Sequence, residues 1–257
     1  MATFLTADGT ELHYTDLGPR GTLALLFLHG WYAASTIWTP VVSRLAKLHR
    51  TIAVDMRGFG ESNAAAGPYN VEIFSDDLSA LIAAANLDPL VVIGHSMGAA
   101  IAQRFAIDRP EAVEGLVLIA PVPAGGLDFP AKVDAMFHGL PGNPQATNAW
   151  LSRLMSPEPP AAVRALLRSA AAAVRPEVAL ESYKSWSTLN FAGEAATIDT
   201  PTLVIASDGD RPEVARARVA ELIVGSRFEI LRDAAHYAVL EQPDRIAGLI
   251  EGFIADL

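Results

Sequence analysis

Short strand-like segments alternate with amphipathic helical patterns along most of this chain. The strand-like segments cover residues 23–28, 51–55, 90–93, 115–120, 202–206 and 227–231. Helical spacing of apolar residues is found between and after them, at residues 37–48, 70–86, 97–108, 212–223 and 242–256. Strands that alternate with helices form parallel sheets, whose central strands are buried on both faces. The pattern therefore predicts a doubly wound parallel α/β sheet.

Two local signals add detail to this prediction. Residues 3–16 alternate around a turn at Asp8-Gly9, which is typical of a β-hairpin ahead of the parallel strands. Asn70 and Pro212 are residue types that begin helices, and each stands at the start of a helical pattern.

The alternation stops between residues 121 and 200. This segment is rich in proline and glycine and has helical stretches at residues 161–174 and 177–190, without a convincing strand. It has too few strong apolar periods to build a core of its own. We therefore expect one α/β core made of residues 1–120 and 201–257, with residues 121–200 as a helical insert after the sixth major strand.

Composition narrows the class of protein further. The 257-residue chain is 51% hydrophobic and 19% charged, which is typical of a globular protein, and its net charge of −10 argues against nucleic-acid and anionic-membrane partners. The absence of cysteine excludes disulfides and thiolate metal sites. The N-terminal residues lack the basic flank and long apolar run of a signal peptide, so we expect a soluble, cytoplasmic protein.

Ser96 is the candidate nucleophile of the chain. It lies within Gly94-His95-Ser96-Met97-Gly98, directly between a predicted strand and a predicted helix. A nucleophile at such a junction sits on a strained turn, in which side chains two residues away on either side would clash. The alternative is an ordinary Gly/Ser turn in a strand-to-helix connection.

His236 is the candidate base. A serine nucleophile needs a histidine to accept its proton, and that histidine needs a carboxylate to orient it. His236 lies in the loop between the last strand and the last helix, where sites occur in parallel sheets. The other five histidines have simpler explanations: solvent exposure for His13, His49 and His138, a backbone-bonded role for His29, and a side chain directed away from the turn for His95.

The acid is expected after the seventh strand, between the serine and the histidine in chain order. Asp208 and Asp210 both stand there. We favour Asp210 because it lies further into the loop, whereas Asp208 could stabilise the turn around Gly209. The backbone N–H groups of Met97 and Trp31 are the candidate oxyanion-hole donors, because one follows the nucleophile and the other follows the first buried strand.

Taken together, these motifs resemble the α/β-hydrolase superfamily. The resemblance rests on His29-Gly30-Trp31, the segment Asp55-Met56-Arg57-Gly58-Phe59-Gly60-Glu61-Ser62, the turn at Gly94–Gly98, Asp210 and His236. The chain looks most like bacterial serine carboxylesterases and aryl esterases, which are related to the cofactor-free haloperoxidases and perhydrolases. The resemblance implies a mostly parallel eight-stranded sheet flanked by helices, with residues 121–200 as its cap, and a structural role for residues 55–62.

The resemblance also implies a reaction class. A serine at the turn argues against haloalkane dehalogenases and epoxide hydrolases, which use aspartate there. We expect hydrolysis of a carboxylic ester or lactone of a small, largely apolar substrate through an acyl-serine intermediate, with no cofactor and no metal. The alternatives are C–C bond hydrolysis or perhydrolysis on the same triad, a cofactor-free oxygenase, and a weakly hydrolytic ligand receptor. The sequence leaves open whether the protein is a monomer or a homodimer.

Large apolar residues of the insert are candidates for a substrate pocket above Ser96. Packing of the insert onto the core explains each of them equally well. The candidate pocket residues are Phe129, Met136, Phe137, Trp150, Trp186 and, beside the candidate base, Tyr237.

Overall fold

A single mixed sheet of eight strands organises the molecule, in the order β1-β2-β4-β3-β5-β6-β7-β8. The computed structural model describes residues 1–87, 89–210 and 213–257, with residues 213–217 as backbone only. The strands are β1 (Ala2–Leu5), β2 (Glu11–Leu17), β3 (Ala24–Leu28), β4 (Arg50–Val54), β5 (Leu90–His95), β6 (Val113–Ile119), β7 (Thr202–Ser207) and β8 (Arg227–Leu231). The hairpin of β1 and β2 pairs antiparallel, β2 joins β4 antiparallel, and all the remaining pairs are parallel. The predicted α/β sheet is therefore confirmed.

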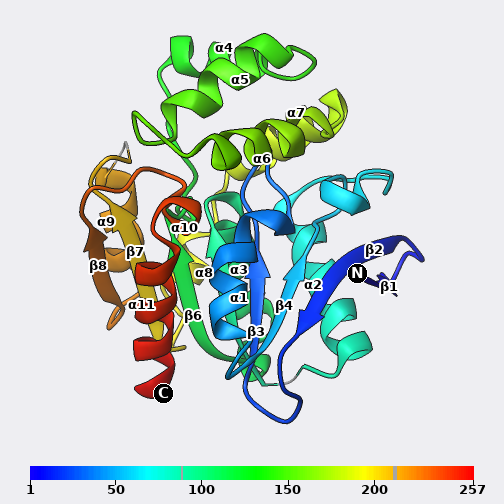
Figure 1. The fold of residues 1–257 in the computed structure, drawn as a ribbon, viewed down its shortest axis with the longest axis vertical. Helices are drawn as coiled ribbons and strands as arrows, with labels where there is room; N and C mark the ends of the chain where they lie inside the picture. The colour runs from blue at the N-terminus through cyan, green and yellow to red at the C-terminus, as the bar shows by residue number, and fades with distance from the viewer. Residues whose placement is uncertain (88, 211–212) are drawn as a thin grey trace.

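Helices cover both faces of this sheet (Figure 1). The helices α1 (Thr39–Leu45) and α11 (Pro243–Ala255) pack against each other on one face, and α2 (Val71–Ala85) and α3 (Met97–Asp108) pack against each other on the opposite face. Every residue of β3, β4 and β5 is buried between these layers. The continuous apolar runs of the sequence are thus explained by strands that have no solvent-facing side.

Four helices lie over the end of the sheet at which the parallel strands finish, at the top of Figure 1. They are α4 (Ala131–His138), α5 (Pro144–Arg153), α6 (Ala161–Ala172) and α7 (Pro176–Ser187). The short helix α8 (Ala192–Ala195) lies instead beside α3. The structure describes no strand in residues 121–200, as the sequence predicted. The position of α4–α7 supports the proposal that this segment forms a cap.

Most predicted boundaries agree with the structure to within a few residues. The Asn70 side chain accepts a hydrogen bond from the Ile73 N–H at 2.8 Å and so caps α2. The helix α9 (Glu213–Leu222) lies where it was predicted, although Pro212 is outside the described residues. A short helix, α10 (Ala238–Glu241), precedes α11.

The predicted helix over residues 37–48 is wrong in its bounds. The chain forms a 3₁₀ turn, η1 (Ser35–Trp38), before α1, and α1 ends at Leu45. Pro40 stands in the first turn of α1, where its missing N–H needs no partner and where its ring prevents the helix from extending backwards. Two further 3₁₀ turns are η2 (Gly60–Ser62) and η3 (Pro110–Ala112).

None of the helices within the described ranges is long and apolar enough to cross a membrane.

Candidate active site

Ser96 occupies a strained turn between β5 and α3. Its backbone angles are φ 55° and ψ −116°, a region that non-glycine residues rarely adopt and that costs about 1–3 kcal/mol. A Cβ at Gly94 would lie 2.4 Å from the Gly98 carbonyl oxygen, and a Cβ at Gly98 would lie 2.4 Å from the Leu28 carbonyl oxygen. Both flanking positions therefore require glycine, because the turn is pressed against itself and against the end of β3.

His236 and Asp210 meet through a hydrogen bond in loops that follow neighbouring strands. His236 Nδ1 donates to Asp210 Oδ2 at 2.8 Å, and the two residues are only 7% and 2% exposed. Asp208, the alternative acid, has a different partner: its Oδ1 accepts the Ala234 N–H at 3.4 Å. The geometry favours Asp210 as the carboxylate that orients His236, with Asp208 in the turn.

The backbone of His236 is held from two sides. Its N–H donates to the Leu154 carbonyl at 3.1 Å, which links this loop to the segment after α5. Its carbonyl accepts a hydrogen bond from His95 Nε2 at 2.9 Å, so His95 carries a proton on that nitrogen. The His95 ring also packs against the His236 ring at 4.7 Å between centroids. We expected the His95 side chain to be directed away from the turn, and the structure places its ring against the ring of the candidate base.

The candidate oxyanion loop lies against Ser96. A Cβ added at Gly30 would come within 3.1 Å of Ser96 Cβ, so the chain after β3 approaches the serine closely. Met97 is the first residue of α3, a position whose N–H has no partner inside a helix. The Trp31 N–H, which follows Gly30, makes no hydrogen bond to any described residue. The Trp31 and Met97 N–H groups therefore remain the candidate oxyanion-hole donors.

His29 fixes the shape of this loop. Its Nδ1–H donates to the Gly30 carbonyl at 2.8 Å and its Nε2 accepts the Met56 N–H at 3.1 Å. Complete burial lowers the pKa of the imidazole from its ordinary value of 6.5, although the negative charge of Asp55 acts to raise it. A neutral ring is also required by the geometry, since one nitrogen must donate and the other must accept.

The Trp31 side chain connects the same loop to the helices above the sheet. Its indole Nε1 donates to the Ala179 carbonyl and to Ser182 Oγ, each at 3.1 Å, and both acceptors belong to α7. The position of the candidate oxyanion loop therefore depends on contacts with α7.

A cavity of about 100 Å³ lies between Ser96 and the helices above it. Its wall contains the predicted residues Trp31, Ser96, Phe129, Phe137, Trp150, Trp186, Asp210, His236 and Tyr237. Met136 does not line it, because successive residues of a helix point in directions about 100° apart and Phe137 faces the cavity from α4. Burial, together with the negative charge of Asp210, raises the pKa of Tyr237, so its phenol stays protonated.

Sequence reasoning missed five wall residues: Ala120, Pro121, Val122, Leu127 and Leu154. The first three directly follow β6, and the carboxyl end of a parallel strand is a signal that could have identified them. Leu127 and Leu154 belong to the insert, where no sequence signal marked them. Among the described residues, no group of three or more His, Cys, Asp or Glu side chains could hold a metal ion.

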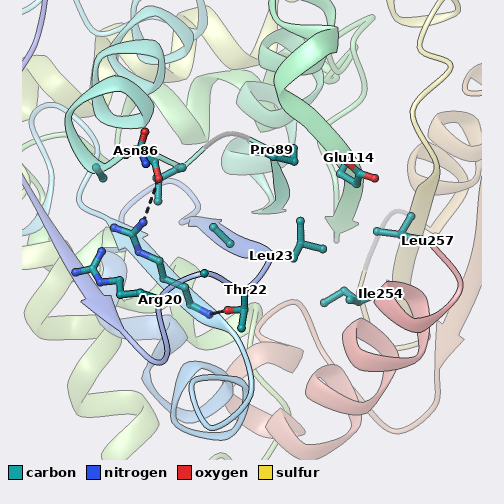
Figure 2. A pocket seen from close by; sticks show the side chains of 13 residues that line it. Arg20, Thr22, Leu23, Asn86, Pro89, Glu114, Ile254 and Leu257 are labelled. Carbon is teal, nitrogen blue, oxygen red and sulfur yellow. Dashed lines mark hydrogen bonds between the residues drawn. The ribbon is translucent and has the colours of Figure 1, made fainter.

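A second and larger cavity, of about 800 Å³, lies at the opposite end of the sheet (Figure 2). Its wall includes Leu23, Arg50 and Glu114, which stand at or next to the starts of parallel strands. Arg50 forms an ion pair with Asp16 at 2.8 Å and donates to the Asn86 carbonyl at 3.2 Å. The Arg50 guanidinium already has partners that hold the chain together, so we place the candidate active site at the smaller cavity, which Ser96, Asp210 and His236 line.

This arrangement matches a known family. A profile of the alpha/beta hydrolase family matches residues 25–249. The chain belongs to this family. The assignment supports an enzyme of the hydrolase class, and the structure confirms the fold that the motifs implied.

Individual relatives carry several activities. The chain is 36% identical over 143 residues to the non-heme chloroperoxidase of Streptomyces lividans, and 32% identical over 154 residues to the soluble epoxide hydrolase of a Corynebacterium species. These matches span 55% and 57% of this chain and only 50% and 52% of those two proteins. The esterase RhEst1 of a Rhodococcus species is 26% identical, covers 100% of this chain and 98% of its own, and superposes with a TM-score of 0.88.

Proposed function

We propose that this alpha/beta hydrolase cleaves a carboxylic ester or lactone of a small, largely apolar substrate through an acyl-serine intermediate. One observation carries the proposal: His236 Nδ1 lies 2.8 Å from Asp210 Oδ2 on the wall of a cavity that Ser96 also lines. Such a pair can hold an imidazole in the tautomer that accepts a proton from serine.

The residues suggest the following steps. Ser96 Oγ attacks the substrate carbonyl carbon, and its proton passes to His236 Nε2, because Nδ1–H is engaged by Asp210. The carbonyl oxygen becomes an oxyanion that the Trp31 and Met97 N–H groups stabilise. The imidazolium protonates the leaving alcohol, and a water that His236 deprotonates then attacks the acyl-serine, releasing the acid and restoring Ser96.

The Ser96→Ala variant tests this function. We expect it to lower kcat for p-nitrophenyl acetate by at least about 10⁴-fold, because the residual rate would come only from binding and the oxyanion hole. An unchanged melting temperature would show that the fold is intact. Retention of most of the turnover in a folded Ser96→Ala variant would refute the proposal.

Perhydrolysis on the same residues is the second candidate, and the match to a non-heme chloroperoxidase favours it. Hydrogen peroxide would then attack the acyl-serine in place of water, giving a peracid and free Ser96. Peracid formation from methyl acetate and peroxide, compared with acetic acid release, measures the share of each reaction. A Ser96→Ala variant that still forms peracid would exclude this candidate.

A further inference from the structure

Two neighbouring cavities share part of their walls. One is the cavity of about 100 Å³ that Ser96 lines, which we call the Ser96 cavity. The other, the side cavity, has a volume of about 510 Å³. Among the described residues, Leu127 and Phe129 line both cavities and no other residue does. These two residues therefore stand between the two spaces.

The side cavity suits an uncharged chain. Its wall comes from the segment after β6 and from α8 and α9. Two of its described wall residues are charged, Asp128 and Arg218, and their charges are opposite, so the wall favours neither an anion nor a cation. Most of the others are apolar: Pro123, Leu127, Phe129, Pro130, Ala192 and Leu222.

The two volumes differ in what they can hold. Ligand pockets typically measure about 300–1,000 Å³, so the Ser96 cavity lies below that range and the side cavity lies within it. A substrate confined to the Ser96 cavity must be short, whereas one that also entered the side cavity could be longer.

The barrier between the cavities is made of side chains on a backbone that is held by other contacts. The Leu127 N–H donates to the Ser187 carbonyl at 2.9 Å. A Cβ added at Gly126 would lie 2.6 Å from that same carbonyl oxygen, so the loop is pressed against the end of α7. The Phe129 ring packs against the Phe137 ring at 4.9 Å between centroids. Shortening the Leu127 side chain would therefore open the barrier without removing the contacts that hold the loop.

We propose that Leu127 and Phe129 set the upper length of the substrate by separating the Ser96 cavity from the side cavity. This inference rests on the proposed ester or lactone hydrolysis at Ser96. It assigns the protein to substrates whose chain is short and uncharged on the side of the carbonyl that faces the barrier. Packed side chains accommodate little additional volume, so each further methylene on that side has to displace them.

Two ester series test the proposal in the unmodified protein. p-Nitrophenyl esters from acetate to octanoate lengthen the acyl chain, and alkyl acetates from ethyl to octyl lengthen the alcohol. We expect kcat/KM to fall at least about tenfold from the shortest to the longest member of at least one series, because a methylene that does not fit costs about tenfold or more. That series identifies the side of the carbonyl that faces the barrier.

The variant Leu127→Ala opens the barrier. In the limited series, we expect the ratio of kcat/KM for the longest ester to that for the shortest to rise about tenfold, close to the effect of burying two more methylene groups. Leu154→Ala is the matched control, because Leu154 is also a half-buried leucine and lines the Ser96 cavity but not the side cavity. The control should keep the ratio within about threefold. Phe129→Leu is a second variant, with the same expected direction, if Leu127→Ala does not fold.

Filling the side cavity tests where the longer chain goes. Ala192 lines the side cavity and not the Ser96 cavity. We expect Ala192→Leu, added to Leu127→Ala, to remove most of the gain for the longest ester, because the new side chain occupies the space that the chain would enter.

Three results would overturn the proposal. The first is an unmodified protein that hydrolyses the longest members of both series as well as the shortest. The second is a ratio that does not rise in the folded barrier variants, or that rises equally in Leu154→Ala. The third is a gain that survives Ala192→Leu. Each of these leaves the acyl-transfer proposal standing if Ser96→Ala is inactive, whereas activity in Ser96→Ala would refute that proposal first.

Discussion

The two ends of the parallel sheet hold cavities of opposite kinds. At the carboxyl ends, about 100 Å³ lies between aromatic side chains and the strained turn of Ser96. At the amino ends, a cavity of about 800 Å³ (Figure 2) lies beside Arg50. The Arg50 guanidinium is already paired with Asp16. The size of a cavity therefore does not indicate where the candidate active site lies in this molecule. Loops that leave the carboxyl ends bring reactive side chains together. At the amino ends, Arg50 instead joins β4 to Asp16 of β2.

The largest expected effect is at the carboxyl ends of the strands and concerns the acid that orients His236. We expect Asp210→Asn to lower kcat for p-nitrophenyl acetate by about 10³- to 10⁴-fold, because an amide would hold His236 in the wrong tautomer. Asp208→Asn, two residues away, is the matched control and should stay within about tenfold. Steady-state kinetics of the two variants checks this. Equal losses in both variants would mean that the carboxylate which orients His236 has been assigned wrongly.

At the amino ends of the parallel strands, a substitution should change the stability of the protein and not its turnover. Arg50→Met removes bonds to Asp16 and to the Asn86 carbonyl, and we expect it to lower the free energy of unfolding by about 1–3 kcal/mol. Arg20→Met is the control, because Arg20 contacts the same Asp16 but its side chain is 66% exposed. Urea unfolding measures both variants. A tenfold fall in kcat/KM in folded Arg50→Met would break the contrast between the two ends.

Low pH should destabilise the folded protein through His29, which follows the carboxyl end of β3. Its pKa is lowered in the folded protein, so protons bind more tightly to the unfolded chain and stability falls as the pH drops below 6.5. The loss from this residue is at most about 1.4 kcal/mol per pH unit. Unfolding measured between pH 7 and pH 5 should show a smaller slope in His29→Asn than in the exposed control His138→Asn. Identical slopes would show that His29 is not the group responsible.

Much of the fold follows from local signals in the sequence. The residues of β3 and β4 are apolar without alternation because both faces of these strands are buried, so the parallel sheet was predictable. The start of α1 was missed although Pro40, a residue type that favours the first turn of a helix, marks it in the sequence.

The candidate site, like the fold, could be predicted from the sequence only in part. Ser96, Asp210 and His236 stand in loops after predicted strands, so their meeting at one end of the sheet could be expected, while their roles stay predictions. Leu127 and Leu154 line the cavity from the insert, whose helices are placed by long-range packing and not by a strand register.

Trapping of the intermediate tests the central claim most directly. The protein is treated with a p-nitrophenyl phosphonate ester, which transfers its phosphonyl group to an activated serine, and the product is digested and sequenced by mass spectrometry. The account predicts one modification, on Ser96, with loss of esterase activity in proportion to labelling and no labelling of Ser96→Ala. Modification of another residue, or full activity after Ser96 is labelled, would contradict it.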